Sequence, residues 1–331
     1  MAEKEVCLVL IFNHRYDKNF EKLDRIYSKR FQNIRFIVPF YDGERDDVIP
    51  VYESSYKFEG YIAQAARELE DDRFSHYVFA ADDLILNPRL NSSNLLSELK
   101  VGREAGYIKE PSALTDRSLG WHPIRETVRL LDKVEGQELR RKNLEGCLPQ
   151  LELPFGVEIT RELPDREKAV ALFAEKNLTM KEITAENLRG PLGEYLYHGG
   201  IDSLLLFVKK KLKGSFFLKY PLAQSYSDFL IAPSISFRKF SHYCGVFAAM
   251  GLFAEVAIPT SLILSCKEVV SEKDTDWRGL EMWSFNRQRT QQLVEFSEKN
   301  NYSVKALFDS FDEKQLYLHP VKLSKWSIDG I

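Results

Sequence analysis

Two adjacent aspartates, Asp82 and Asp83, directly follow residues 76–81, an apolar run that predicts a buried strand. Two carboxylates at such a place are costly unless their charge is neutralised, and a divalent cation is the usual partner. A cation held there could bridge the two phosphates of a nucleotide and offset the charge of a departing diphosphate. The alternative is an Asp-rich turn in which Asp83 or Asn87 caps a short helix.

Two further carboxylates lie beside apolar segments near the C-terminal third of the chain. Glu255 stands between residues 250–254 and 256–259, both apolar, so desolvation would raise its pKa unless it is paired. A raised pKa suits a base that takes a proton from an attacking hydroxyl, whereas an internal ion pair or a solvent-facing position is the structural alternative. Asp228 follows a serine at a predicted strand end. It is the rival base, or an Asx-turn residue or a ligand of an acceptor hydroxyl.

The elements that position these residues alternate between strand and helix. Residues 6–12, 34–40 and 76–81 are continuous apolar runs typical of strands buried on both faces, and residues 19–31 and 58–69 carry apolar side chains at helical spacing. This alternation predicts a parallel α/β sheet, in which ligands bind at the carboxyl ends of the strands.

Polar residues follow the first predicted strand at that edge. Asn13, His14 and Arg15 come directly after it, where the base and phosphate of a nucleotide would lie. Arg15 could equally pair with Asp17 on the surface.

The second strand and the second helix add two more candidates. Asp42 follows the second strand and could hold a uracil or a ribose hydroxyl, or simply form the turn. Gly60 stands near a helix start, where the backbone could approach a ligand, although a simple N-terminal cap explains it as well.

The chain divides into three segments. Residues 1–90 form the predicted nucleotide-binding α/β half. Residues 91–218 are less regular, with helices predicted at 92–103, 125–141, 165–176 and 201–213, and we interpret them as a mostly helical insertion. We expect residues 219–331 to form the acceptor-side half and C-terminal segment of the same domain, if that domain is catalytic.

Composition excludes several classes of protein. The 331 residues carry 46 Lys and Arg against 49 Asp and Glu, a net charge of -3, so bulk charge does not recruit nucleic acid. The cysteines at 7, 147, 244 and 266 form no CxxC pair, which excludes a zinc cluster or a redox motif. No apolar stretch approaches the roughly 20 residues of a spanning helix, so we expect a cytoplasmic protein.

Residues 79–88 (FAADDLILNP) resemble the metal-binding acidic motif of GT-A type glycosyltransferases, whose pattern in some branches has three aspartates followed by Leu-Asn. Ala81 stands where the first aspartate would be. The resemblance implies that Asp83 is the direct metal ligand, that Asp82 also helps to hold the metal and contacts the donor, and that metal affinity is lowered by the missing acid.

The resemblance extends to residues 226–233, 245–247 and 253–260, and to residues 318–322 (LHPVK) near the C-terminus. It is poor in the middle of the chain. It implies that His319 is a further metal ligand and that Lys322 pairs with a phosphate. A lone histidine of this kind is otherwise a packing or surface residue.

The sequence thus predicts a GT-A-like, Rossmann-type mixed α/β sheet flanked by helices. We expect a glycosyltransferase that moves a sugar from a nucleotide-sugar donor to a hydroxyl on a glycan or lipid-linked acceptor, with Mn²⁺ or Mg²⁺ as cofactor, as in polysaccharide biosynthesis. The alternatives are a catalytically inactive glycosyltransferase-like module, which Ala81 favours, and a nucleotidyltransferase, which the lack of glycine at residues 13–15 disfavours.

A basic and aromatic stripe at residues 207–220 favours either peripheral contact with an anionic membrane or, more simply, a solvated helix face.

Overall fold

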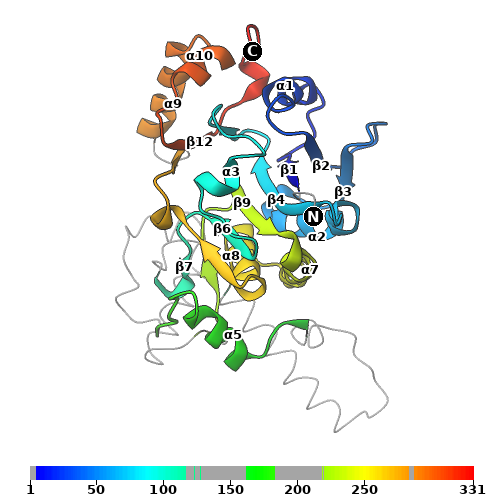
Figure 1. Ribbon diagram of the computed structural model, residues 1–331, viewed down its shortest axis with the longest axis vertical. Helices are drawn as coiled ribbons and strands as arrows, with labels where there is room; N and C mark the ends of the chain where they lie inside the picture. Colours follow the sequence, from blue (N-terminus) through cyan, green and yellow to red (C-terminus); the bar gives the residue numbers. More distant parts are fainter. Residues whose placement is uncertain are drawn as a thin grey trace, which may run out of the picture.

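The computed structural model describes residues 5–116, 123, 127, 162–182, 218, 220–282 and 287–331 (Figure 1). Its strands form a seven-stranded mixed sheet in the order β10-β6-β9-β4-β1-β2-β3. The bounds are β1 Glu5–Ile11, β2 Asn33–Pro39, β3 Val48–Val51, β4 Phe74–Ala81, β6 Ala105–Ile108, β9 Phe229–Pro233 and β10 Glu268–Val270. The predicted mixed α/β sheet is confirmed.

The first half of this sheet is parallel. β1 pairs with β2 on one side and with β4 on the other, and β2 pairs with β3. The chain therefore moves outward from β1 to β3 and then returns across β1 to β4. Such a reversal leaves a crevice at the carboxyl ends of the two strands, where open α/β sheets bind ligands.

The second half contains one reversed strand. β9 lies antiparallel between β4 and β6, and β10 is parallel to β6. Because β9 runs the other way, the residues that precede it lie at the same edge as the carboxyl ends of β4 and β6. The start of β9 therefore contributes to the same edge of the sheet as the carboxyl ends of β4 and β6.

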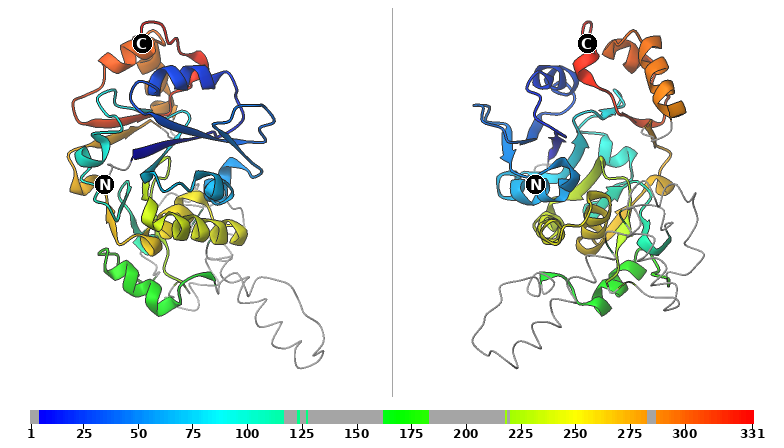
Figure 2. Two further views of the ribbon diagram at one scale, coloured as in Figure 1. Left: turned by 45° about the vertical axis from the view of Figure 1, so that its right-hand side comes forward. Right: turned by 180° about the vertical axis from the view of Figure 1, so that it is seen from behind.

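Helices cover both faces of the sheet (Figure 2). One face packs on α1 Asn19–Tyr27 and on the C-terminal region, and the other packs on α2 Phe58–Leu69, α7 Ser234–Met250 and α8 Ala254–Ser265. β1 shows why: Leu8 and Leu10 point to the α1 side, whereas Cys7 and Val9 point to the α2 and α7 side. A strand that is apolar on both faces needs both layers.

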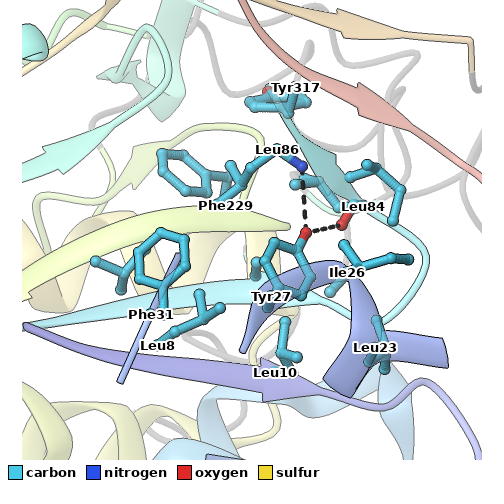
Figure 3. Packing of buried hydrophobic residues seen from close by; sticks show 14 of the residues in the cluster. Leu8, Leu10, Leu23, Ile26, Tyr27, Phe31, Leu84, Leu86, Phe229 and Tyr317 are labelled. Carbon is cyan, nitrogen blue, oxygen red and sulfur yellow. Dashed lines mark hydrogen bonds between the residues drawn. The ribbon is translucent and has the colours of Figure 1, made fainter. Parts of the chain in front are cut away.

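The hydroxyl of Tyr27 is a polar anchor within the core on the α1 side (Figure 3). The hydroxyl of Tyr27 donates to the carbonyl of Leu84 at 3.0 Å and accepts from the amide of Leu86 at 3.2 Å. Both bonds lie within the buried cluster formed by β1, α1 and the segment after β4. A buried hydroxyl needs such partners, and here they also fix the chain directly beyond Asp83.

A smaller sheet is built on that same segment. β5 Ile85–Leu86 pairs antiparallel with β12 Gln315–His319, and β12 pairs parallel with β11 Arg278–Glu281. The remaining elements are β7 Ser112–Ala113, β8 Ala223–Gln224, α3 Leu95–Glu98, α5 Arg166–Ala174, α9 Arg287–Lys299 and α10 Val304–Asp309, with short 3-10 turns at Ser55–Lys57, Leu114–Asp116, Glu272–Asp274 and Leu323–Lys325.

Among the described residues, the strands and helices predicted from apolar periodicity are confirmed within a few residues, except one. The helix expected at 92–103 is only the single turn of α3, because the chain reverses at Lys100 with a positive φ of 55° and enters β6. Helix 165–176 corresponds to α5. The helices expected at 125–141 and 201–213, and the stripe at 207–220, lie almost entirely outside the described residues. Within the described part of the chain, no helix is long and apolar enough to cross a bilayer.

Candidate functional site

The carboxyl ends of β1 and β4 meet through Asn13 and Asp82. The amide of Asn13 donates to Oδ1 of Asp82 at 3.2 Å, and the amide of Asp82 donates to the carbonyl of Ile11 at 2.8 Å. The two strands are parallel neighbours, so their ends are adjacent although the residues are 69 positions apart. The structure therefore brings together two of the residues that the sequence places after separate strands.

Asp82 is buried, with 5% of its surface exposed. The side-chain amide of Asn19, at the start of α1, donates to its Oδ2 at 3.3 Å. Burial, and then the neighbouring charge of Asp83, raise the pKa of Asp82 to about 7. Asp82 is therefore fixed by α1 and by the loop after β1, and at neutral pH its carboxyl is only partly ionised.

Asp83 and His319 are in contact. Nε2 of His319 lies 3.0 Å from Oδ1 of Asp83, and the ring N–H donates to the carboxylate. The short ladder between β5 and β12 produces this contact, because β5 begins two residues after Asp83 and β12 ends at His319. The amide of Val321 also donates to the carbonyl of Asp83 at 2.6 Å. The segment at residues 318–322 therefore closes over the acidic motif.

The ring of His319 is almost fully enclosed, with 1% of its surface exposed. Burial alone would lower the pKa of His319. The hydrogen bond to Asp83 and the negative charges of Asp83, Asp228 and Glu281 outweigh burial and raise the pKa. Nδ1 of His319 shares a hydrogen bond with the hydroxyl of Tyr226. The imidazole is thus oriented through both of its nitrogens.

Asp228 lies at the same edge, immediately before β9. Its carbonyl accepts from the amide of Ala81 at 2.9 Å, and its carboxylate is hydrogen-bonded to the hydroxyl of Tyr226. Desolvation raises the pKa of Asp228, while the nearby His319 opposes the shift. A polar chain thus runs from Asp83 through His319 and Tyr226 to Asp228.

This chain of polar contacts continues into residues that the sequence did not indicate. Tyr317 stacks on Tyr226 with ring centroids 6.4 Å apart, and its hydroxyl bonds to the carboxylate of Glu281. Glu281 also pairs with Lys109, which follows β6. No local pattern marks Asn19, Tyr226, Glu281 or Lys109, because each is a single polar residue whose partner is distant in the sequence. The one available signal is their position at predicted strand or helix ends.

The loops after β1 and β2 are joined by Arg15. Its guanidinium pairs with Asp17 at 2.9 Å and with Asp42 at 2.5 Å, and donates to the carbonyl of Phe40 at 3.3 Å. The surface pairing with Asp17 that the sequence left open is therefore present. His14 is exposed and its ring lies 6.5 Å from that of Tyr16. These residues lie beside Asn13 at the edge formed by the carboxyl ends of β1 and β2.

Three further predicted residues are Glu255, Gly60 and Lys322. Glu255 is half-buried in the first turn of α8, and its carbonyl accepts from the amide of Ser225 at 3.1 Å. Gly60 is buried in the first turn of α2, where an added Cβ would lie 3.2 Å from Glu53 and 3.4 Å from Ala248 of α7. Close packing of α2 on α7 therefore explains this glycine. Lys322 is exposed, next to Val321.

The described ranges contain no group of three or more His, Cys, Asp or Glu side chains that could hold a metal ion. Asp83 and His319 nevertheless offer one carboxylate oxygen and one imidazole nitrogen at a single point. Mg²⁺ is commonly held by one or two carboxylates together with substrate phosphates and water, and neutral imidazole is a common metal ligand. The donor set therefore fits a metal that arrives with a phosphorylated ligand.

No protein-family model and no curated protein matches the sequence. Among solved structures, the chain is similar to core-mannan synthase A from Aspergillus fumigatus, in a form described as containing Mn and GDP. The sequences are 11% identical, the match covers 82% of this chain and 74% of that chain, and the TM-score is 0.32. A likeness this weak carries no argument, so the description of the fold rests on the sheet itself.

Proposed function

We propose that this protein is a metal-dependent glycosyltransferase that moves a sugar from a nucleotide-sugar donor to a hydroxyl acceptor. The observation that carries the proposal is the contact between Asp83 and His319 beside the carboxyl ends of the neighbouring strands β1 and β4. An acid and a histidine from opposite ends of the chain meet where an α/β sheet binds nucleotides, and Asp228 lies on the same polar chain.

Asp83 and His319 would hold Mn²⁺ or Mg²⁺ on the diphosphate of the donor. When bound, the metal supplies positive charge that stabilises the departing nucleoside diphosphate. Asp82 would orient the donor, because Asn13 and Asn19 fix its carboxylate. Lys322 is exposed beside this point, where it would pair with a phosphate as a point charge.

In the transfer step, an acceptor hydroxyl oxygen forms the new bond to the anomeric carbon as the bond from that carbon to the diphosphate breaks. The hydroxyl proton then needs a base. Asp228 suits this role better than Glu255, because its carboxylate is linked to His319 through Tyr226, and desolvation raises its pKa. A carboxylate with a raised pKa accepts a proton more readily at neutral pH.

The competing proposal is a catalytically inactive module that binds a glycan or a partner. Ala81 favours it, because an acid is missing from the motif, and so does the direct hydrogen bond between Asp83 and His319, which a metal would have to replace. The two proposals differ in whether a donor is consumed.

Calorimetric titration with nucleoside diphosphates, with and without Mn²⁺, tests the proposed function. We expect binding that requires the metal and is lost in Asp83→Ala. The matched control is Asp72→Ala, an exposed aspartate just before β4, at the opposite edge of the sheet. Absence of binding to every nucleoside diphosphate removes the proposal. Donor hydrolysis or transfer that Asp83→Ala abolishes in a folded protein excludes the inactive module.

A further inference from the structure

Two aromatic side chains project into solvent at the carboxyl ends of β2 and β3. Phe40 is 61% exposed and Tyr52 is 68% exposed, and their rings meet edge-to-face with centroids 5.9 Å apart. In the described part of the chain, the exposed large aromatic side chains all lie between residues 40 and 56. β2 and β3 are neighbouring strands beside β1 (Figure 1), so this pair belongs to the edge that carries Asn13 and Asp82.

Phe40 is held in an unfavourable backbone conformation. Its φ is 54°, in the left-handed region that a bulky side chain seldom adopts. The amide of Phe40 donates to the carbonyl of Val51 at 2.8 Å, and its carbonyl accepts from Arg15, so both sides of the residue are fixed. Asparagine or glycine would fit this backbone at lower cost and expose no apolar ring. Strain that persists at an exposed position is a reason to look for function.

The pair lies at a suitable distance from the proposed diphosphate site. Neighbouring strands are about 4.8 Å apart, so β2 is about 10 Å and β3 about 14 Å from β4, measured across the sheet. A nucleoside diphosphate whose phosphates lie at Asp83 would extend its base over this range. Arg15 connects the two regions, because it lies two residues after Asn13 and bonds to Phe40.

The charges around the pair select among possible ligands. Arg15 is paired with Asp17 and Asp42. Arg45, in the loop between β2 and β3, is paired with Asp24 and Asp47. Because both arginines are already neutralised, this surface does not favour an anionic membrane or a polyanion. It favours an uncharged flat ring, which stacks on an aromatic face.

We propose that Phe40 and Tyr52 form a stacking platform for the base of the nucleotide. This inference rests on the proposed function and deepens it, because it assigns the base to the ends of β2 and β3, with the phosphates at β1 and β4. Every nucleobase has a π-face, so stacking contributes affinity without selecting one base. Asp42, which follows the same strand, would add hydrogen bonding to the base or the ribose.

The test compares two ligands in the presence of Mn²⁺, a nucleoside diphosphate and inorganic pyrophosphate, by calorimetric titration. Phe40→Asn and Tyr52→Ala each remove one ring. We expect each to weaken binding of the nucleoside diphosphate by about 5- to 100-fold and to leave pyrophosphate binding unchanged. Phe40→Asn suits the left-handed backbone, so its thermal stability should be equal or higher even though binding is weaker.

Ile235→Ala is the matched control. Ile235 is an exposed apolar residue in the first turn of α7, which begins where antiparallel β9 ends and therefore lies at the opposite edge of the sheet. The platform is refuted if the unaltered protein and the two variants bind the nucleoside diphosphate with equal affinity. It is also refuted if both variants lose affinity for pyrophosphate to the same degree as for the nucleoside diphosphate. Failure of the unaltered protein to bind any nucleoside diphosphate refutes the proposed function, and the platform with it.

Discussion

Nε2 of His319 lies 3.0 Å from Oδ1 of Asp83, although the two residues are 236 positions apart in the chain. The contact depends on the pairing of β5 with β12, which places Leu318 opposite Ile85 and so brings His319 beside the acidic motif. His319 and Asp83 therefore act as one unit, because removing Asp83 takes one hydrogen bond from the buried imidazole, and removing His319 takes one from the half-buried carboxylate.

Replacing His319 by alanine should remove one of the two proposed metal ligands while Asp83 remains. We expect Mn²⁺-dependent binding of a nucleoside diphosphate to weaken at least tenfold, which corresponds to about 1.4 kcal/mol of binding free energy. Calorimetric titration measures this directly. The matched control is His242→Ala, an exposed histidine of α7 that pairs with Glu162. Unchanged affinity in the folded His319 variant would exclude His319 as a ligand.

Metal affinity should rise with pH, because Asp83 and its neighbours hold the pKa of His319 above its ordinary value. A protonated imidazole cannot bind a metal, so Mn²⁺ must displace a proton near neutral pH. We expect tighter Mn²⁺ binding at pH 8 than at pH 6, with proton release. Titrations in two buffers of different ionisation enthalpy measure the release. His319→Gln should release fewer protons; an equal number in both proteins would contradict the assignment.

Glu59 should make the protein less stable as pH rises. Its carboxyl is fully buried in the first turn of α2, and neither oxygen has a hydrogen-bond partner among the described residues. Burial raises its pKa from 4.5 to about 8. Between these two values the unfolded chain binds fewer protons than the folded protein, so the free energy of unfolding falls by about 1.4 kcal/mol for each pH unit.

Replacing Glu59 by glutamine should remove this dependence. We expect Glu59→Gln to be at least as stable as the unaltered protein at pH 8 and to show a shallower slope between pH 5 and pH 8. Urea unfolding across this range provides the measurement. Glu68→Gln, at an exposed position on the same helix, should keep the original slope. The same slope in both variants would show that Glu59 is ionised in the folded protein.

A side chain at Gly279 should disturb the packing around Tyr317. An added Cβ would lie 2.2 Å from the ring of Tyr317, which is buried against Tyr226 and Phe229 and has little room to move. We expect Gly279→Ala to lower the free energy of unfolding by about 1–3 kcal/mol, as overpacking usually does. Gly102→Ala is the control, because no atom lies within 4 Å of its added Cβ. Equal stability in thermal unfolding would mean that Tyr317 moves at no cost.

The sequence by itself determined the first half of the sheet. The apolar runs that form β1, β2 and β4 have buried residues on both faces, and such runs form strands between two covering layers. The same patterns predict that Asn13 and Asp82 follow strand ends. That they are adjacent follows from the parallel pairing of β1 with β4.

Only the tertiary structure decided the composition of the site. Hydrogen bonds between strands join residues of any separation, and no local pattern records which strands will pair. The antiparallel insertion of β9 places Asp228 beside Ala81, and the β5–β12 ladder brings His319 to Asp83 and Tyr226. The sequence could name Asp83, Asp228 and His319 one at a time, whereas Asn19, Tyr226 and Glu281 become visible only when distant segments are brought together.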